Sequence, residues 1–498
     1  MSLSDPPRGV AGVAAADPDR VALVCGEERV TFGALDASAN AVAHRLAGAG
    51  VGPGDRVAVL AGNGTGIFAV WNGVARLGAL VVPVSYRLTS PEIAYILADS
   101  GATVFVHDGS PAALEAAAGV GSALTVDEAL ADPRHDPPGE EFLGSPVTVF
   151  TYTSGTTGRP KGIARAAPAP AREAATAPFA AFWGFGPTDV HLLCGPAYHT
   201  APGAYAQMTL VEGGRVVIMP RWDATECLRL IESEGVTTSH MVPANFIRIL
   251  EADWEAVDRS SVRRILHAAA PCPVPVKRRI LEVFPAGTVW EYYGASEGMA
   301  SVASPEDWLA RPGTVGRPFP GLSVKILDEE GRERPPGEIG QIYISAFPGH
   351  RFEYHNAPEK TEGAWKETHF TVGDLGSLDA EGYLFLADRR TDLIISGGVN
   401  IYPAEVETAL IEDDAVVDAA VYGIPDDRMG AVVHAVVEVR PGAARDAGAL
   451  LERLATRLAG FKAPRTVEFV DELPREPNGK VLKTRLRERH LRAEVPPG

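Results

Sequence analysis

Short apolar runs alternate with longer amphipathic segments along the first third of the chain. The runs at 56–60, 81–84 and 103–106 predict strands, because each holds apolar residues over four or five positions. Apolar residues at helical spacing over 68–80 predict one helix. Ser90, Pro91 and Glu92 begin another, which runs to residue 99. This order of strand and helix predicts a parallel sheet with helices on its faces.

The alternation of strand and helix candidates continues from residue 166 to 330, and the pattern of expected elements then changes. A strand candidate at 216–219 and a helix candidate at 224–234 lie between longer loops. Short strands separated by turn signals follow at 323–327, 340–345 and 382–386. This later region predicts a small antiparallel sheet or barrel next to the α/β body.

At 498 residues the chain is too long for one ordinary core, and strands and helices alternate again after residue 388. We therefore expect an α/β fold with two domains. Residues 1–388 are expected to form a large N-terminal domain of two α/β subdomains plus a small antiparallel β-barrel-like subdomain. Residues 389–498 are expected to form a small α+β C-terminal domain.

Composition restricts the class of protein. The formal net charge of −18 argues against a nucleic-acid partner, but a local basic pocket can still bind a small anion. No apolar run approaches the ~20 residues of a membrane helix, and the N-terminus lacks the order of a signal peptide. The four cysteines lie far apart without a C-x-x-C pair, so we expect neither structural zinc nor a disulfide framework, and a cytoplasmic location fits.

A loop rich in glycine and hydroxyl residues follows the apolar run 147–150. Residues 152–162 read Tyr-Thr-Ser-Gly-Thr-Thr-Gly-Arg-Pro-Lys-Gly, and their N–H groups, hydroxyls and lysine suit a polyphosphate. The loop is not a Walker A motif, since Pro160 stands where that pattern needs Gly and Gly162 where it needs Ser or Thr. A linker is the alternative, but linkers rarely follow a β-run. The composition therefore predicts a nucleotide-phosphate loop.

Four further stretches carry residues that suit nucleotide chemistry. They are 291–298 (Glu-Tyr-Tyr-Gly-Ala-Ser-Glu-Gly), 370–376 (Phe-Thr-Val-Gly-Asp-Leu-Gly), 388–407 and 473–480 (Leu-Pro-Arg-Glu-Pro-Asn-Gly-Lys). Tyr293 can stack on a purine, and Asp374 can accept hydrogen bonds from both hydroxyls of a ribose. Glu297 offers a hard oxygen ligand to Mg²⁺, and Arg389 offers fixed donors to ribose or phosphate oxygens.

With these motifs in this order, the chain resembles the adenylate-forming enzymes: acyl-CoA synthetases, firefly luciferase and peptide-synthetase adenylation domains. The run Gly-Gly-Val-Asn-Ile-Tyr-Pro at 397–403 is most similar to the acyl-CoA synthetase branch. The resemblance implies that Glu297 is the magnesium ligand and that Lys480 stabilises the adenylation transition state. The nucleotide-binding residues that it implies are Thr153, Ser154, Gly155, Thr156, Thr157, Gly158, Lys161, Ala270, Tyr292, Tyr293, Gly294, Ser296 (where the family usually has Thr), Asp374 and Arg389.

The resemblance also implies an acyl pocket. By this match His199 lies near the reacting carboxylate as a catalytic residue, and a purely structural histidine is the alternative. The small residues at 268–270, Ala-Ala-Ala, leave room for a large acid, although the whole chain is rich in Ala and Gly. The general character of the sequence is most similar to that of bacterial ligases for steroid- or terpenoid-like acids. Our hypothesis is therefore that the substrate is a bulky, hydrophobic carboxylic acid.

For thioester formation the resemblance implies a mobile C-terminal domain that rotates about a hinge. The hinge falls at Thr391, where the family usually has Asp or Lys. Rotation moves Lys480 away and brings in Gly397 and Gly398, which leave a narrow path for pantetheine. Phe461 is expected to stack on the adenine of coenzyme A and Arg465 to face its phosphate. Some ligases have Arg where Ala463 stands, which weakens the expectation for this stretch.

A serine hydrolase is the rival class. Residues 294–298 fit the G-x-S-x-G elbow around Ser296, with Asp374 and His434 following in the required order. That elbow needs a strand before the serine and a helix directly after it, and 299–305 begins no obvious helix. A hydrolase would also leave the phosphate-type loop without a role.

The combined prediction is an enzyme: an AMP-forming acid–thiol ligase that makes acyl-AMP and then acyl-CoA. Its expected cofactors and partners are ATP, Mg²⁺, coenzyme A and a small carboxylic acid, with no nucleic acid and no membrane. Two alternatives stay open: an enzyme that loads a carrier protein, and one specialised for the thioester step from a preformed adenylate. A homodimer is one option for its assembly.

Overall fold

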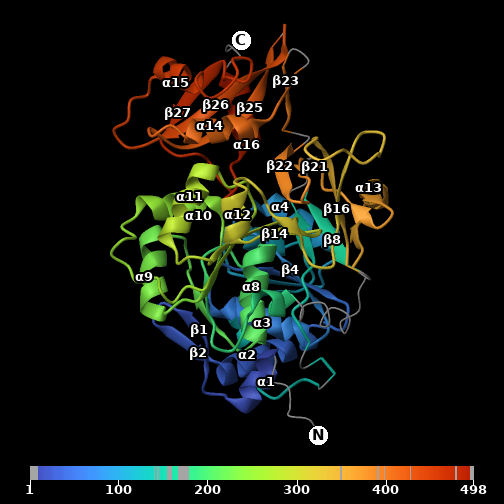
Figure 1. Cartoon of the computed structure of the whole chain (residues 1–498). Helices are drawn as coiled ribbons and strands as arrows, with labels where there is room; N and C mark the ends of the chain where they lie inside the picture. Colours follow the sequence, from blue (N-terminus) through green and yellow to red (C-terminus); the bar gives the residue numbers. More distant parts are fainter. Residues whose placement is uncertain are drawn as a thin grey trace. The chain divides into compact units, whose positions relative to one another are not determined.

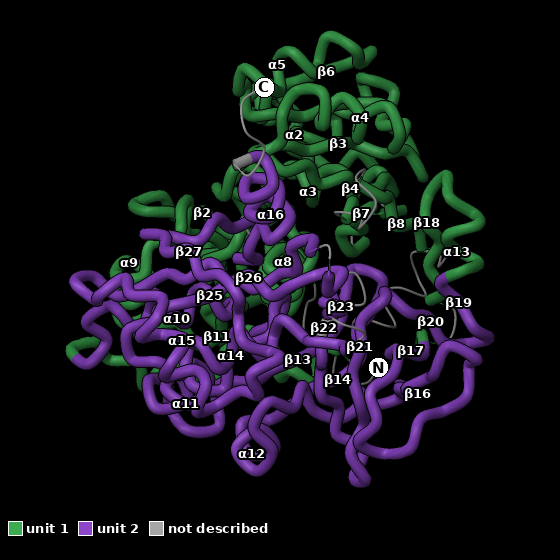
Figure 2. The backbone as a smooth tube through the Cα atoms, turned by 90° about the horizontal axis from the view of Figure 1, so that it is seen from above, with its two compact units in different colours: residues 1–240, 256–265, 346–363 green, residues 241–255, 266–345, 364–498 purple. Residues whose placement is uncertain are grey.

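The computed structural model of the chain describes residues 9–139, 141–142, 145–153, 160–165, 179–347, 350–389, 392–396, 399–426, 428–476 and 479–493. Contacts divide the chain into two compact units, which Figure 2 colours separately. Unit 1 comprises Met1–His240, Ala256–Ile265 and Ala346–Gly363, and unit 2 comprises Met241–Glu255, Leu266–Ser345 and Ala364–Gly498. These units interleave along the sequence and do not test the domain boundary expected at 388, which stays a prediction.

Unit 1 contains a four-stranded parallel sheet of β4 (Leu80–Pro83), β3 (Arg56–Leu60), β5 (Val104–His107) and β6 (Ala123–Thr125), in that order. Val57 and Val59 enter one hydrophobic cluster, whereas Ala58 and Leu60 enter another. Both faces of β3 are therefore buried, which explains why its sequence is a continuous apolar run rather than an alternating one. The surrounding helices are α2 (Phe32–Gly48), α3 (Thr65–Ala75), α4 (Ser90–Ser100), α5 (Pro111–Ala117) and α6 (Val126–Leu130).

Several predicted boundaries in this region shift, and the helix after β3 shifts most. The helix predicted over 68–80 is α3, which begins three residues earlier and ends at Ala75. Gly78, at φ 64°, turns the chain into β4, so apolar residues that belong to the turn and strand had extended the helical pattern. The apolar run 147–150 contributes a single parallel bridge, Val149 to Val81, and the strand β7 (Thr151–Thr153) follows it.

A second sheet in unit 1 orders β2 (Glu28–Thr31), β1 (Val21–Cys25), β10 (Arg215–Ile218), β9 (Val190–Leu193) and β11 (Thr238–Met241). A third, antiparallel sheet orders β18 (Phe352–Tyr354), β8 (Lys161–Arg165) and β7. The other helices of this unit among the described residues are α1 (Gly9–Ala16), α8 (Thr200–Val211), α9 (Ala224–Glu234) and α13 (Pro358–Ala364, whose last residue falls in unit 2). The bounds of α9 are those predicted, since Asp223 accepts a bond from the Glu226 N–H and Gly235 closes the helix with φ 63°.

Unit 2 contains the predicted antiparallel region. Strand β17 (Gly340–Ser345) pairs with β16 (Val324–Leu327), β20 (His369–Phe370) and β21 (Asp374–Leu378), all antiparallel. The sheet continues through β22 (Leu384–Arg389) and β19 (Trp365–Lys366). Another antiparallel set joins β13 (Val289–Ala295), β14 (Gly298–Ala303) and β15 (Arg317–Pro318). Other elements of this unit are α10 (Pro243–Glu251), α11 (Val274–Val283) and α12 (Pro305–Ala310), whereas β12 (Arg264–His267) has two residues in each unit.

The C-terminal part of unit 2 is built on β25 (Val416–Asp426), β26 (Gly430–Val439) and β27 (Thr466–Val470), drawn in orange and red in Figure 1. Helices α14 (Pro403–Ile411), α15 (Ala447–Leu454) and α16 (Lys483–Ala493) accompany this sheet. The hairpin of β23 (Ile394–Ser396) and β24 (Val399–Ile401) precedes it. Mixed strands and helices of this kind agree with the expected α+β C-terminal region.

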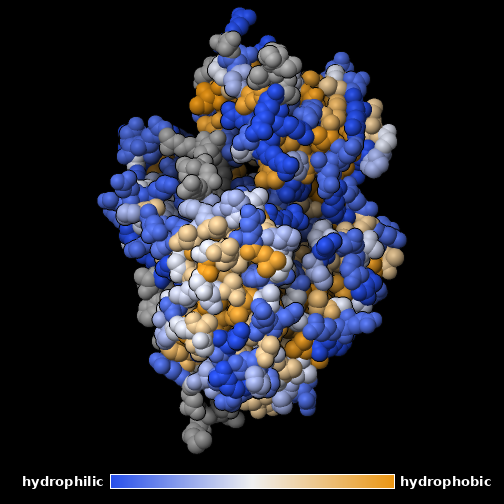
Figure 3. Space-filling model, turned by 180° about the vertical axis from the view of Figure 1, so that it is seen from behind, coloured by the Kyte–Doolittle hydropathy of each residue, from blue (hydrophilic) through white to orange (hydrophobic). Residues whose placement is uncertain are grey.

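Figure 3 shows the distribution of hydrophilic and hydrophobic side chains on one face of the molecule. The face in Figure 3 is largely hydrophilic, with smaller apolar areas between the charged residues. Across the described ranges, no helix is long and apolar enough to cross a membrane.

Candidate active site

The predicted phosphate loop connects two adjacent antiparallel strands of unit 1. Thr153 at the end of β7 pairs with Lys161 at the start of β8. The Tyr152 hydroxyl donates to Asp99 Oδ2 at 2.6 Å, which fixes one strand, and the Lys161 ammonium lies 5.1 Å from the centre of the Tyr354 ring. The residues of the turn itself lie outside the described residues: Ser154, Gly155, Thr156, Thr157 and Gly158.

Ser296 and Glu297 form the two-residue turn of the β13–β14 hairpin. Ala295 pairs with Gly298 across the turn, so an antiparallel strand, not a helix, follows the serine. A Cβ on Gly294 would lie 2.8 Å from the Gly298 carbonyl oxygen, so glycine is required there. The strand–turn–helix geometry of a hydrolase elbow is therefore absent, and the rival hydrolase hypothesis is wrong at this site.

Tyr293 and Asp374 meet in unit 2. The Tyr293 hydroxyl donates to Asp374 Oδ2 at 2.6 Å, and Tyr293 is buried on β13 beside Tyr292. Asp374 begins β21, and its Cα partner on β22 is Arg389, whose side chain lies outside the described residues. Pairing of β21 with β22 therefore brings Asp374 and Arg389 together, and a side-chain hydrogen bond joins Asp374 to Tyr293, which lies 81 residues earlier in the chain. The bond orients the carboxylate, which is the group predicted to accept hydrogen bonds from ribose hydroxyls.

The residues around the hairpin turn fit Mg²⁺. Glu297 is half-buried at the turn, and a carboxylate oxygen is the hard ligand that Mg²⁺ prefers, normally shared with phosphate oxygens and water. The donor chemistry of Glu297 is therefore appropriate for the predicted role as the metal ligand.

The three alanines at 268–270 follow β12 and include an unusual backbone conformation. Ala269 has φ 76°, in the left-handed region that non-glycine residues rarely adopt. Ala270, the predicted adenine-side residue, is half-buried directly after it. Strained residues of this kind cluster at ligand sites, so the backbone here is consistent with the predicted loop.

His199 is the N-cap residue of α8 in unit 1. Its Nε2 is buried and has no hydrogen-bond partner among the described residues, and burial lowers the pKa of its imidazole to about 4. The ring lies 4.5 Å from that of Tyr198, centre to centre. At neutral pH His199 is therefore neutral, which suits a hydrogen-bonding or gating role and excludes a permanent positive charge.

Asn63 holds the segment that carries His199, and the sequence analysis did not identify it. The Asn63 amide donates to the carbonyl oxygens of Gly195 and Met219, each at 2.9 Å, and accepts from the Ala197 N–H at 2.8 Å. Gly203, one turn into α8, is needed because a Cβ there would lie 2.3 Å from the Ala197 carbonyl oxygen. An isolated Asn between glycines gives no signal of this role in the sequence.

A buried cluster of ionisable side chains around Glu291, the residue before Tyr292, had not been predicted. Lys277 on α11 is fully buried, forms a hydrogen bond with His267 and lies 3.4 Å from Glu291 Oε2. Burial raises the pKa of Glu291, which the nearby Lys277 partly offsets. One signal was present in the sequence: Lys277 shares the helix face of the apolar Ile280 and Phe284.

The backbone of the predicted catalytic lysine, Lys480, is held by hydrogen bonds from described residues. Its carbonyl oxygen accepts from the Glu476 N–H at 2.7 Å, and Arg475 donates to the Gly479 carbonyl at 2.8 Å. Arg475 is itself paired with Asp418 of β25, and burial lowers the pKa of its guanidinium to about 10. The turn that carries Lys480 is therefore anchored to the C-terminal sheet.

Of the residues predicted to bind coenzyme A, Phe461 and Arg465 are exposed, and Arg465 lies near an acidic side chain. Phe461 is 56% exposed, which leaves its ring available for stacking. Arg465 is exposed, and its guanidinium lies 3.9 Å from Asp426. Three further predicted residues lie outside the described residues: Gly397, Gly398 and Thr391, the expected hinge.

Fold and site together define the class of enzymes that activate carboxylic acids with ATP. The model of the AMP-binding enzyme family matches residues 10–347, and that of the AMP-binding enzyme C-terminal domain matches residues 405–480. The chain belongs to the AMP-binding enzyme family. This confirms the predicted adenylate-forming superfamily, with its large N-terminal and small C-terminal domain.

Relatives with known roles match over nearly their whole length. The chain is 34% identical to a fatty acid–acyl-carrier-protein ligase of Streptomyces coeruleorubidus, over 95% of this chain and 94% of that protein. It is 35% identical to a feruloyl-CoA synthase of an Amycolatopsis species, over 95% and 96%. The structure of o-succinylbenzoate CoA synthetase from Bacillus subtilis, with its acyl-adenylate, has a TM-score of 0.84, 30% identity and coverage of 97% and 99%.

These findings confirm the predicted enzyme class. The chain is an AMP-forming acid–thiol ligase that works through an acyl-adenylate, with ATP, Mg²⁺ and coenzyme A as its cofactors.

Proposed function

We propose that the chain is an acyl-CoA synthetase for a bulky, hydrophobic carboxylic acid, of which steroid- and terpenoid-like acids are the first candidates. The observation that carries the nucleotide part is the 2.6 Å bond between Tyr293 and Asp374, which prepares a carboxylate for a ribose. Tyr292 and Tyr293 provide the aromatic surface for adenine, and Asp374 with Arg389 provides the acceptor and donor for ribose and phosphate.

Adenylation needs groups that oppose charge as the carboxylate attacks the α-phosphorus. The loop from Thr153 to Lys161 supplies N–H groups, hydroxyls and an ammonium for the phosphates. Glu297 would hold Mg²⁺, which would supply positive charge against the phosphates. Lys480 supplies a point charge. Two hydrogen bonds restrain the backbone beside it: the Glu476 N–H donates to the Lys480 carbonyl oxygen, and Arg475 donates to the Gly479 carbonyl oxygen.

The acid is expected to bind near the segment that Asn63 holds. A neutral His199 donates or accepts a hydrogen bond without adding a charge that would compete with the phosphates. The small side chains at 268–270 support the proposal of a large acid. The named activities of the two relatives, on fatty acids and on an aromatic acid, support a hydrophobic acyl group.

For the thioester step we propose that residues 389–498 rotate as a domain about Thr391. This movement replaces Lys480 by Gly397 and Gly398, and Phe461 and Arg465 then bind the nucleotide end of coenzyme A. A cytoplasmic location and a homodimer belong to the same proposal. A carrier-protein thiol is the second candidate acceptor, because one relative is named for such an acceptor.

The test is pyrophosphate release with a panel of steroid-like, terpenoid-like, aromatic and linear acids, with and without coenzyme A. The largest kcat/KM is expected with a bulky acid, and a preference for linear acids would overturn that part of the proposal. In the Lys480→Ala variant adenylation should fall by about 100-fold or more, because one transition-state donor is lost. Conversion of synthetic acyl-AMP to acyl-CoA should persist in the same variant.

Lys325→Ala is the matched control, since Lys325 is a surface lysine of unit 2 that pairs with Glu333 at 2.7 Å. It should retain both half-reactions. Unmodified adenylation in Lys480→Ala would refute the role of that lysine. Turnover of acyl-AMP without any adenylation by the unmodified enzyme would favour an enzyme specialised for the thioester step.

A further inference from the structure

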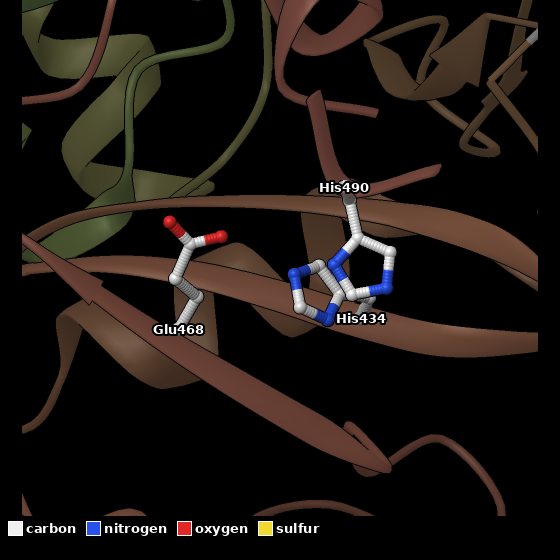
Figure 4. Close-up of side chains that lie close together, drawn as sticks. All are labelled: His434, Glu468 and His490. Atoms are coloured by element: carbon white, nitrogen blue, oxygen red, sulfur yellow. The ribbon is translucent and has the colours of Figure 1, made fainter. Parts of the chain in front are cut away.

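One cluster of metal-ligating side chains lies in the C-terminal sheet and has no role in the proposed reaction. His434 on β26, Glu468 on β27 and His490 on α16 each offer one ligand atom, and these three atoms lie within 4.8 Å of one another. Figure 4 shows the two imidazole rings next to each other, with the carboxylate of Glu468 beside them. Two imidazoles and one carboxylate are a ligand set that Zn²⁺ accepts.

Strand register explains why these residues meet. Strands β26 and β27 are parallel, with His434 opposite Thr466 and Val436 opposite Glu468. Residues two apart on a strand share a face, so His434 and Glu468 lie on the same face of this sheet. Leu486 of α16 is buried in the hydrophobic cluster on the sheet, and His490 is one helical turn further along the same helix face.

His434 has the surroundings of a prepared ligand. It is only 2% exposed, and its Nδ1 lies 2.6 Å from Thr466 Oγ1. When Nδ1 donates to that hydroxyl, Nε2 keeps its lone pair, as in metal-binding histidines oriented by a second partner. Nε2 is buried and makes no hydrogen bond within the part of the chain that the structure describes. A buried polar atom of this kind calls for an ion or a water molecule.

We propose that His434, Glu468 and His490 bind one Zn²⁺ ion, which fastens α16 to the C-terminal sheet. Tetrahedral bonds of about 2.1 Å place ligand atoms about 3.4 Å apart, so closing from 4.8 Å needs side-chain shifts of about 1 Å. Water would complete the fourth position. The scattered cysteines had argued against structural zinc, but these ligands are histidine and glutamate, whose spacing of 34 and 22 residues forms no sequence motif.

A competing cation is present. Arg489 forms an ion pair with Glu468 and must yield one carboxylate oxygen when the metal binds. Removing Arg489 should therefore strengthen metal binding, a result that a damaged fold cannot produce. The helix α16 begins three residues after Lys480, so the ion would also stiffen the segment that follows this lysine.

The test uses the full chain, stripped by a chelator and kept in excess Mg²⁺ to occupy Glu297. Binding of Zn²⁺ is followed by competition with a chromogenic indicator, and Co²⁺ is used to observe the visible bands of a tetrahedral site. One equivalent should bind. Glu468→Gln and His490→Gln should each weaken binding by at least about 10-fold, and Thr466→Val by roughly 10-fold. Arg489→Gln should tighten binding several-fold.

His135→Gln is the matched control, since His135 is an exposed histidine of unit 1, and its binding should equal that of the unmodified chain. Zn²⁺ should also raise the melting temperature of the unmodified chain and of His135→Gln, but not of Glu468→Gln. Absence of saturable binding would overturn the proposal. Equal affinity in all variants, or unchanged affinity in Arg489→Gln, would equally overturn it.

Discussion

Replacing Tyr293 by phenylalanine removes one hydroxyl and keeps the ring that is expected to face adenine. The lost bond is a 2.6 Å contact from a buried phenol to the Asp374 carboxylate. Hydrogen bonds to charged groups contribute about 1.5–3 kcal/mol, so the free energy of unfolding should fall by about that amount. Part of this loss should also appear in ATP binding, because the freed carboxylate must be ordered again when it meets the ribose.

We expect ATP to bind Tyr293→Phe more weakly by about 1–2 kcal/mol, which is a factor of about 5–30 in Kd. The assays are calorimetric titration with ATP and pyrophosphate release at varied ATP. The penalty should shrink with 2′,3′-dideoxy-ATP, which lacks the hydroxyls that Asp374 is proposed to bind.

Tyr383→Phe provides the matched control in the same unit. The Tyr383 hydroxyl donates to Asp307 Oδ1 at the same 2.6 Å, but neither residue belongs to the predicted site. This variant should lose comparable stability and keep the Kd for ATP. If the two variants bind ATP equally well, or equally poorly, the assigned role of Tyr293 and Asp374 in ribose binding is refuted.

Two further predictions concern unit 1. Burial lowers the pKa of His191 and of His240 to about 3 from 6.5, so the unfolded chain binds more protons between these values. Their stabilisation is complete above pH 6.5 and is lost as the pH falls towards 3. Between pH 7 and pH 5 we expect a loss of about 2 kcal/mol for each histidine, measured by urea unfolding, and a flat profile would contradict the cause. Asn63→Ala should cost about 2–4 kcal/mol of stability and lower kcat/KM for the acid while the Kd for ATP stays constant. A parallel loss of ATP affinity would show that Asn63 does not act locally.

Several helices and strands could be predicted from the sequence because the residues that specify them are consecutive. The strand at 56–60 and the helix at 224–234 have the predicted bounds, since an apolar run buried on both faces and a capped amphipathic helix are written in consecutive residues. The helix predicted over 68–80 was too long, because the turn at Gly78 depends on how β4 enters the sheet. Apolar periodicity cannot separate a helix end from the start of a buried strand.

In the candidate site, too, some features follow from short stretches of sequence and others depend on strand pairing. The motif residues Tyr293, Glu297 and Asp374 could be identified from the sequence because their chemical types and order are specific. The rival elbow at Ser296 rests on one short pattern with no obvious helix after it, and the antiparallel pairing of Ala295 with Gly298 shows that a strand follows the serine instead. Strand pairing joins residues whose positions along the chain do not reveal their contact.

By itself, then, the sequence determined the alternating α/β architecture and the family, and it supplied the predicted nucleotide-binding residues, because each is encoded in short stretches. Tertiary structure alone decided that Tyr293 holds Asp374, that Asn63 supports the His199 segment, and that His434, Glu468 and His490 share one sheet face. Such contacts depend on register and burial, since side chains far apart in the chain meet only when strands pair and water is excluded.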